Sequence, residues 1–469
     1  MSALEISAEE FRSLALRVTD LATRFLVSLP TLPTFPDVSG ELTRERFGEP
    51  LPERGAKEAA LERLEDVLAM IRPPSPRFYG YILGSGEPVA ALADLLASIL
   101  NQGVTAWRSS PAGVAIEKQV IDWLATAVGC RDFGGSLCGG ASAANLMGLA
   151  MAREQKLPAN ENGAQPGIVY ASSEAHMSIP KAMALLGLGR RNLHLVPADA
   201  AWRMDVRALE AFIEEDLAAG RTPLAVVASA GTVNTGAIDP LESIAAVCRR
   251  RGLWLHIDGA YGGLAAIASP DGLRGLALAD SLALDPHKWL YQPVDCGALL
   301  YRSPAAARTA FAHTGEYART FGSDPLESFA FFEESMELSR RFRALKLWLS
   351  LRYHGLETFR AAIRSDLQHA RDLARDIERT PQLELLAPVE LSAVCFRYRN
   401  AVAQSELNPL NAAILRRLIE RGRVYLSNAS LSGRFALRAC FVNHRTSDAD
   451  VAEIVPEVLA ASREVLGAG

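Results

Sequence analysis

The stretch SLALDPHKWLYQPVDCGALLYR, residues 281–302, decides the fold. Its two apolar runs, 281–284 and 297–301, predict buried strands, and the turn DPHKW follows the first of them. Lys288 therefore lies at a strand exit. A histidine and a tryptophan flank it, and partial shielding from water favours the neutral amine that Schiff-base chemistry needs. A surface lysine in a turn is the alternative, but no other lysine of the chain has both a histidine and an aromatic neighbour.

The composition is that of a globular protein. The chain has 469 residues, of which 49% are hydrophobic and 22% charged, enough for one large domain and one or two smaller ones. A formal net charge of -5 gives no basic surface for nucleic acid, so we expect a small-molecule partner.

The six cysteines are widely spaced, without a C-x-x-C pair or a Cys/His cluster at metal-ligand spacing. We therefore expect reduced thiols and no metal. The N-terminus, MSALEISAEEFRS, lacks a basic segment followed by an apolar core, and no apolar run approaches the ~18 residues of a membrane span. The sequence thus predicts a cytoplasmic protein that does not bind a membrane.

Short apolar segments alternate with helical patterns from residue 168 onward: IVYAS, LHLVPA, LAVVASAG, LWLHID, SLALD and GALLYR. This alternation predicts an α/β fold with a mostly parallel sheet, covered by helices on both faces. Ligands of such folds bind at the carboxyl ends of the strands, where the sequence places His176, Thr232, Asp258 and Lys288.

A glycine-rich turn runs directly into a helix in SLCGGASAANLMGLAMAR, residues 136–153. Small residues let backbone N–H groups approach an anion, and a helix N-terminus favours negative charge. Gly140, Ala141 and Ser142 are therefore a candidate phosphate site. An ordinary strand-to-helix turn has the same pattern, so this signal alone is weak.

Two of the strand-end residues have a plainer alternative. Asp258 closes the apolar strand LWLHID, where its carboxylate could pair with a protonated pyridine nitrogen or cap a helix. His176, in SSEAHMS, could stand at a helix start without a special role. The presence of Lys288 downstream favours the cofactor interpretation of Asp258.

Both ends of the chain predict smaller units. Residues 8–29 and 56–71 have the apolar spacing of amphipathic helices, and a proline-rich link joins them. Such an arm cannot bury its apolar faces alone, so we expect a homodimer. We expect three domains: a helical arm over 1–72, a large domain over 73–355 and a small α+β domain over 356–469.

The apolar periodicity of the sequence is weaker just after the predicted strand over 297–301. Residues 303–340 show little apolar period and predict a long connection, followed by an amphipathic helix over 340–353. For the small domain we expect a helix over 357–379, strands near 392–398, 423–427 and 435–442, and a closing helix over 448–466.

The sequence Asp-Pro-His-Lys-Trp, residues 285–289, resembles the lysine motif of the group II pyridoxal-phosphate (PLP) decarboxylases. That family includes the aromatic-L-amino-acid, histidine and glutamate decarboxylases, and the likeness runs in matching order from about residue 73 to 443. It implies the fold type I of PLP-dependent transferases, which is aspartate-aminotransferase-like, with pyridoxal 5'-phosphate as cofactor. It also implies that the N-terminal arm wraps a partner subunit.

The resemblance implies a role for each matching residue. Lys288 would carry the cofactor, His176 and Ala260 would cover the two faces of its ring, and Asp258 would hold the ring nitrogen. The phosphate would lie on Gly140, Ala141, Ser142 and His287, and Thr232 would contact the cofactor rim. The catalytic residues implied are Lys288, His176 and Tyr317, the last as the tyrosine of a mobile loop that protonates the substrate Cα.

The substrate is less well defined. Tyr81 and Trp107 match residues that line the substrate side chain in the aromatic-amino-acid enzymes, but Thr105 stands where those enzymes tend to have another aromatic residue. Arg438 matches an arginine that holds a carboxylate in glutamate decarboxylases, and a structural ion pair is an equal alternative. Ala143 replaces the family's usual glutamate, which leaves the phosphate role intact.

The predicted activity is PLP-dependent decarboxylation of an L-amino acid, with an aromatic one favoured, to an amine and CO2. One alternative is a decarboxylating oxidative deaminase that yields an aldehyde, against which Tyr317 argues. Another is a PLP-dependent carbon–carbon lyase, against which Trp289 and the missing membrane span argue. A binding protein without catalysis would be expected to lack Lys288 or Asp258.

Overall fold

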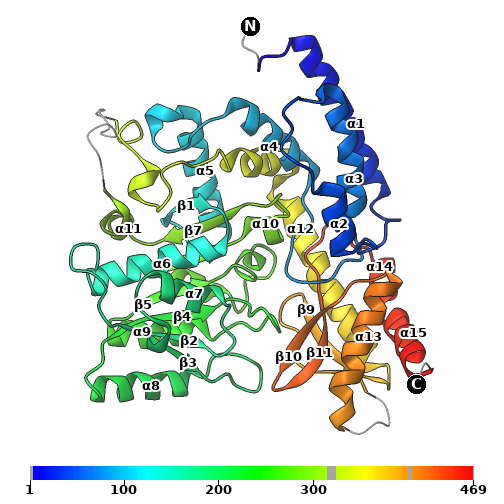
Figure 1. Ribbon diagram of the computed structural model, residues 1–469. Helices are drawn as coiled ribbons and strands as arrows, with labels where there is room; N and C mark the ends of the chain where they lie inside the picture. Colours follow the sequence, from blue (N-terminus) through cyan, green and yellow to red (C-terminus); the bar gives the residue numbers. More distant parts are fainter. Residues whose placement is uncertain (1–3, 314–323, 400–403, 468–469) are drawn as a thin grey trace.

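The computed structural model describes residues 4–313, 324–399 and 404–467 (Figure 1). A large body contains the central sheet, a smaller sheet lies beside it near the C-terminus, and the N-terminal helices flank both on one side. The described helices include none that is long and apolar enough to cross a membrane.

The central sheet has seven strands in the order β1-β7-β6-β5-β4-β2-β3. Strands β2 to β6 run parallel, whereas β7 is antiparallel to both β1 and β6. The predicted α/β class with a mostly parallel sheet is confirmed. The seven strands are β1 Gly134–Cys138, β2 Ile168–Ser172, β3 Leu193–Val196, β4 Pro223–Ser229, β5 Trp254–Asp258, β6 Ser281–Leu284 and β7 Gly297–Tyr301.

Helices cover both faces of this sheet, so its strands are buried and nearly continuously apolar. Successive side chains point to opposite faces; Val226 belongs to one core cluster and Val227 to the other. Helix α6 packs on β5, β6 and β7. The helices of the large body are α5 Pro111–Ala127, α6 Ala141–Lys156, α7 Ser178–Leu185, α8 Val206–Ala218, α9 Leu241–Arg251, α10 Pro286–Trp289 and α11 Pro304–Phe311.

The C-terminal unit is a four-stranded antiparallel sheet in the order β10-β11-β9-β8 with helices on it. Helix α12, Ala344–Glu378, leads into it and has non-helical backbone at Gly355, next to the predicted domain boundary. The other elements are β8 Leu383–Leu385, β9 Ala393–Tyr398, α13 Leu407–Arg421, β10 Ser427–Leu431, β11 Arg434–Cys440, α14 Asp448–Ala452 and α15 Ile454–Gly467.

Several predicted elements differ in the structure; the closing helix over 448–466, for example, is divided into α14 and α15. The predicted helix over 340–353 begins only at Ala344, because the Arg340 side chain turns into the core, where it pairs with Glu117 and donates to the carbonyl of Val104. The predicted connection over 303–340 contains helix α11. The predicted strand near 423–427 is wrong, since Tyr425 pairs instead with the segment 77–79, and β10 starts at residue 427.

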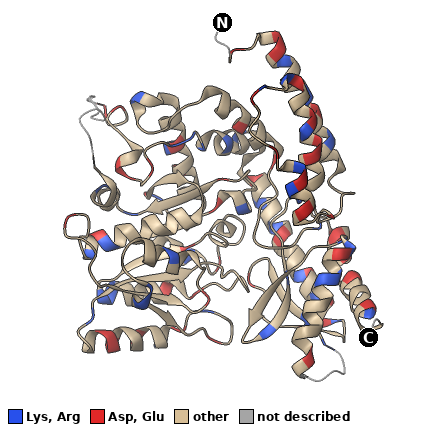
Figure 2. Cartoon of the chain, viewed as in Figure 1, with Lys and Arg blue, Asp and Glu red and all other residues tan. Residues whose placement is uncertain are grey.

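The N-terminal arm consists of α1 Ala8–Ser28, α2 Gly40–Phe47, the 3-10 turn η1 Lys57–Glu62 and α3 Arg63–Met70. The predicted helix over 56–71 is thus partly 3-10. The ion pairs Arg17–Glu58 and Arg24–Glu65 join α1 to η1 and α3. Charged side chains of both signs lie along the arm (Figure 2). Helix α1 has no buried residue, and its Phe11 is 47% exposed. The arm therefore leaves apolar surface uncovered.

Candidate active site

A cavity of about 650 Å³ lies at the carboxyl ends of β4, β5 and β6, beside the turn between β1 and α6. The structure brings most of the predicted site residues to it. Those that line the cavity are Tyr81, Gly140, Ala141, Ser142, His176, Thr232, Asp258, Ala260, His287, Lys288 and Arg438.

Lys288 lies on α10, the single turn that follows β6, and Pro286 begins this turn. Its Nζ is 2.9 Å from Oδ2 of Asp285, and Oδ1 of Asp285 accepts from the backbone N–H of Ala141 at 2.8 Å. The buried Asp285 carboxylate thus joins the lysine to the start of α6. Asp285 is not among the predicted site residues, although an acidic residue between a buried strand and the lysine turn is a usable signal in the sequence.

The turn before α6 has the shape of an anion site. Gly140 has φ 143°, a value that favours glycine. The N–H groups of Gly140 and Ser142 donate to no described residue, and the N-terminus of α6 adds positive potential. A Cβ on Gly140 would lie 3.5 Å from Cε1 of His287, so the glycine keeps a space open between this turn and the histidine. These residues fit a phosphate group.

Asp258 ends β5 with its carboxylate at the cavity. Oδ2 accepts from Nδ2 of Asn145 at 2.9 Å, and Oδ1 accepts from the backbone N–H of Ala260 at 3.2 Å. The 3-10 turn that follows has its N-cap at Gly262, so the helix-cap alternative does not describe Asp258. In the described part of the chain no arginine or lysine forms an ion pair with it, so the carboxylate could pair with a bound cation.

Two histidines line the same cavity. His176 accepts at Nδ1 from the backbone N–H of Ser178 at 3.2 Å, and burial lowers its pKa below the ordinary value. His287 accepts at Nδ1 from the backbone N–H of Cys296 at 3.2 Å, and burial together with the nearby lysine lowers its pKa despite Asp285. Both imidazoles are therefore neutral at pH 7. Thr232 is buried and shares a hydrogen bond of 2.9 Å with Thr235.

Arg438, on β11, reaches the cavity from the small sheet and is only 3% exposed. Its guanidinium donates to Oγ of Ser427 at 3.1 Å and to the carbonyl of Tyr81 at 3.4 Å, and Nε has no partner in the described part of the chain. Among the described residues no carboxylate pairs with it, so the ion-pair alternative is not found there. A buried guanidinium without a counter-ion is a ready partner for a bound carboxylate.

Tyr81 lies at the edge of the cavity with a backbone φ of 60°, which is unusual for a residue other than glycine. Strained backbone of this kind is concentrated at functional sites. Trp107 does not line the cavity; its backbone N–H donates to the carbonyl of Phe329, and its side chain packs against the large core. Tyr317 falls in 314–323, outside the described residues.

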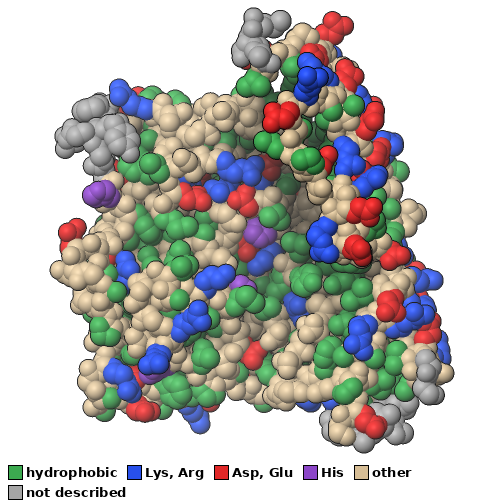
Figure 3. Space-filling model, viewed as in Figure 1, with side chains coloured by type: hydrophobic (Ala, Val, Ile, Leu, Met, Phe, Trp, Pro, Cys, Tyr) green, Lys and Arg blue, Asp and Glu red, His purple; other side chains and the backbone are tan. Residues whose placement is uncertain are grey.

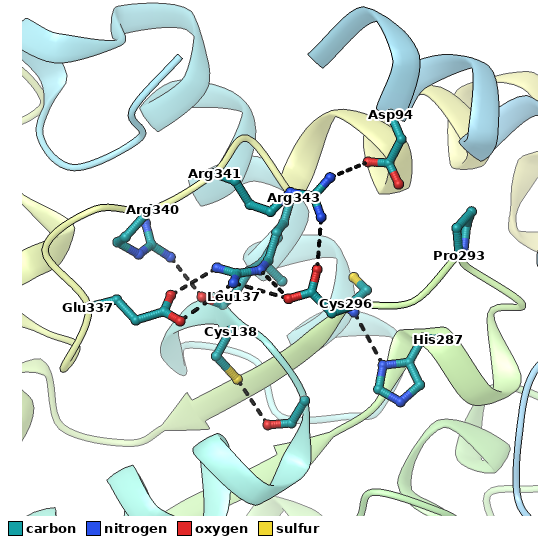
Figure 4. A network of polar contacts seen from close by, with 12 residues as sticks. Asp94, Leu137, Cys138, His287, Pro293, Cys296, Glu337, Arg340, Arg341 and Arg343 are labelled. Atoms are coloured by element: carbon teal, nitrogen blue, oxygen red, sulfur yellow. Dashed lines mark hydrogen bonds and ion pairs between the residues drawn. The ribbon is translucent and has the colours of Figure 1, made fainter. Parts of the chain in front are cut away.

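A network of ion pairs holds the loop that follows the lysine (Figure 4). Asp295, in this loop, accepts from Arg343 Nε and from Arg341 NH1, each at 3.1 Å. Although burial raises the pKa of Asp295, Arg343 lowers it below the ordinary value. Lys346 is fully buried and donates to Asp94 and to the carbonyl of Pro293, each at 2.9 Å. This network connects the start of α12 with the lysine loop, which gives a structural role to the charged residues at 341, 343 and 346.

Comparison with known proteins identifies the family to which the chain belongs. The family model described as "Pyridoxal-dependent decarboxylase conserved domain" matches residues 50–399. An aromatic-L-amino-acid decarboxylase of Bacillus atrophaeus is 33% identical over 470 residues, covering 98% of this chain and 97% of the relative.

Solved structures agree with this family. Catharanthus roseus tryptophan decarboxylase, crystallised with L-tryptophan, matches with a TM-score of 0.90 and 29% identity, covering 98% of this chain and 99% of that one. Rhodiola rosea 4-hydroxyphenylacetaldehyde synthase matches with a TM-score of 0.89 and 27% identity, covering 98% and 99%. The chain belongs to the pyridoxal-dependent decarboxylase family and has its PLP-dependent fold. It is an amino-acid decarboxylase that uses pyridoxal 5'-phosphate.

A first prediction follows from the close approach of Gly297, in β7, to Gly140 in the turn before α6. A Cβ on Gly297 would lie 2.6 Å from the carbonyl carbon of Gly140 and 2.7 Å from its nitrogen. Gly297→Ala should therefore displace the turn and weaken pyridoxal 5'-phosphate binding about 5- to 150-fold, because overpacking of this kind typically costs about 1–3 kcal/mol. Gly55→Ala, where a Cβ meets nothing within 4 Å, is the control. Equal cofactor affinities in both variants, by fluorescence titration, would contradict the prediction.

Proposed function

We propose that the protein decarboxylates an aromatic L-amino acid to the amine and CO2. The observation that carries this proposal is that one cavity holds the amine of Lys288, the Asp258 carboxylate and the buried guanidinium of Arg438, for which the described residues supply no counter-ion. The first two suit the cofactor, and the third suits an anionic substrate group.

When bound, pyridoxal 5'-phosphate supplies a carbonyl that condenses with amines and a protonated ring that takes up electrons as CO2 leaves. Lys288 would hold it covalently until an amino acid displaces the lysine. Gly140, Ala141, Ser142 and His287 would bind its phosphate, with Thr232 at its rim. Asp258 would keep the ring nitrogen protonated through an ion pair. His176 and Ala260 would cover its two faces.

The remaining residues would orient the substrate. Arg438 and His176 are the candidate partners of its carboxylate, one charged and one a neutral donor. Holding the bond from Cα to the carboxylate perpendicular to the cofactor ring would select decarboxylation over other reactions. Tyr81 would contact the substrate side chain.

Support for an aromatic substrate comes from the relatives, which include aromatic-L-amino-acid and tryptophan decarboxylases. The similarity to an aldehyde synthase keeps the oxidative alternative open to test. Trp107 lies outside the cavity of its own chain, so its proposed contact with substrate requires a second subunit.

The activity is tested by supplying the PLP-loaded protein with single L-amino acids and measuring CO2, amine and hydrogen peroxide. We expect tryptophan, tyrosine, phenylalanine or a hydroxylated relative to give CO2 and amine in equal amounts, because the relatives include aromatic-L-amino-acid and tryptophan decarboxylases. Glutamate and histidine serve as controls. No CO2 from any amino acid would refute the proposal, and peroxide equal to CO2 would favour the aldehyde-forming alternative.

Tyr317 is proposed to deliver its phenolic proton to the substrate Cα after CO2 has left, on the strength of the sequence match. Tyr317→Phe removes only this proton donor. Amine formation should fall roughly 100- to 10,000-fold, the usual contribution of a general acid. CO2 release should persist, because dissolved oxygen can then take two electrons from that carbon to give hydrogen peroxide, leaving an aldehyde and ammonia after hydrolysis.

Two outcomes of the same measurements would contradict this role of Tyr317. Amine produced at the parent rate would show that another group supplies the proton. Loss of CO2 release with normal cofactor binding would place Tyr317 in an earlier step.

We further propose a cytoplasmic homodimer with the three domains 1–72, 73–355 and 356–469. The arm and helix α4, Pro88–Leu100, support a dimer, because Leu96 is 47% and Ile99 53% exposed on α4. Figure 3 shows a hollow between the arm and the body of the molecule. Such uncovered apolar surface fits an obligate interface.

Sedimentation tests the dimer directly. The parent protein should sediment as a dimer at micromolar concentration, and Leu96→Asp should weaken it because burying an unpaired carboxylate in an apolar interface is unfavourable. Leu466→Asp, which alters an exposed leucine on α15 instead of α4, is the matched control. A stable, active monomer of the parent would contradict the proposal.

A further inference from the structure

A chain of buried hydrogen bonds leads from the sheet to the cavity and involves residues that the proposed function does not use. Nε1 of Trp254 donates to Oγ of Ser281 at 2.9 Å, and Nδ1 of His256 lies 2.8 Å from the same oxygen. Nε2 of His256 lies 2.9 Å from Oδ1 of Asn145. His256, Asn145 and Ser281 are completely buried, so water cannot substitute for these partners.

The donors and acceptors of this chain allow one arrangement of protons. The Asp258 carboxylate can only accept, so Asn145 must present its Nδ2 to Oδ2 of Asp258, at 2.9 Å. Oδ1 of Asn145 then faces His256, whose Nε2 must carry a hydrogen. Nδ1 of His256 accepts from the hydroxyl of Ser281, which itself accepts from Trp254. Burial lowers the pKa of His256 to about 4, so the neutral imidazole that this arrangement requires is present at pH 7.

The chain continues from Asn145 to the cavity. Its second Nδ2 hydrogen points to Oγ of Ser178 at 2.9 Å. The hydroxyl hydrogen of Ser178 is then free for Nδ1 of His176, 2.8 Å away, and the backbone N–H of Ser178 faces the same nitrogen at 3.2 Å. With two donors directed at Nδ1, the hydrogen of neutral His176 lies on Nε2. That nitrogen donates to no described residue, and His176 lines the cavity.

We infer that Asn145 and His256 are positioning residues that fix the proton of His176 on Nε2 and make it a hydrogen-bond donor to an anionic group in the cavity. The group is the carboxylate of the amino-acid substrate, which rests on the proposed function. A neutral histidine held in this tautomer cannot accept a proton at the nitrogen that faces the substrate. Asn145 also orients Asp258, so a single amide links the two residues proposed to meet the cofactor ring.

The tautomer of His176 can be measured without substrate or cofactor. The full chain, labelled with [15N]histidine, is studied by solid-state NMR near pH 7, and His176→Gln and His256→Gln identify the two signals. Both histidines should be neutral with the hydrogen on Nε2. A hydrogen on Nδ1 of His176, or a positively charged ring, would overturn the inference whether or not the protein is a decarboxylase.

A pair of asparagine variants tests the part played by Asn145. Asn145→Leu removes the link, and Asn411→Leu removes a buried asparagine that also makes three hydrogen bonds, but inside the C-terminal unit. Asn145→Leu should leave His176 in mixed tautomers and lower kcat/KM about 10- to 100-fold, the range for a hydrogen bond to a charged group. Asn411→Leu should change neither, even if it lowers Tm.

Ser178→Ala provides the same test if Asn145→Leu does not fold, since it removes only the hydroxyl donor to His176. An unchanged His176 tautomer together with a parental kcat/KM in the folded variant would refute the inference. Absence of any decarboxylation by the parent protein would refute the proposed function instead, and the NMR result would still decide the tautomer.

Discussion

The site depends on the two contacts that the Asp285 carboxylate makes, one with the start of α6 and one with Lys288. One oxygen accepts from the N–H of Ala141 at 2.8 Å, and the other lies 2.9 Å from Nζ of Lys288. A buried carboxylate needs such compensation, and the helix N-terminus and the ammonium group supply it from opposite sides. The lysine turn and the proposed phosphate turn, distant in sequence, are thereby held together. Gly297 of β7 also approaches Gly140 so closely that position 297 has no space for a side chain.

Two polar networks extend this arrangement. On one side the ion pairs of Asp295, Arg341 and Arg343 hold the loop that follows Lys288. On the other side Asn145 and His256 hold the residues proposed to meet the cofactor ring. Both networks are directional, and the one around Asn145 and His256 is buried, so they specify the positions of side chains more than they add to stability. The cavity between them is left with one buried guanidinium that has no described counter-ion.

Much of the fold and part of the site could be predicted from the sequence, because they depend on patterns within short segments. Apolar runs of strand length, a glycine turn before a helix and a lysine turn after a strand identify the parallel part of the sheet and the strand ends at the cavity. Tyr81, Ala260, His287 and Arg438 are expected only from the family resemblance. The antiparallel placement of β7 and the pairing of Tyr425 with residues 77–79 depend on contacts between distant segments. Asn145 and His256 look like ordinary residues of a buried helix and strand. Trp107 matches a substrate position in sequence but lies away from the cavity of its own chain.

The central claim is that Lys288, at the exit of β6, carries the cofactor. Borohydride reduction of the PLP-loaded protein followed by peptide mapping tests it most directly, because reduction makes the bond between lysine and cofactor permanent. The account predicts a pyridoxyl group on Lys288 and nowhere else. A label on Lys181 or on the buried Lys346, or no label on any lysine, would contradict it.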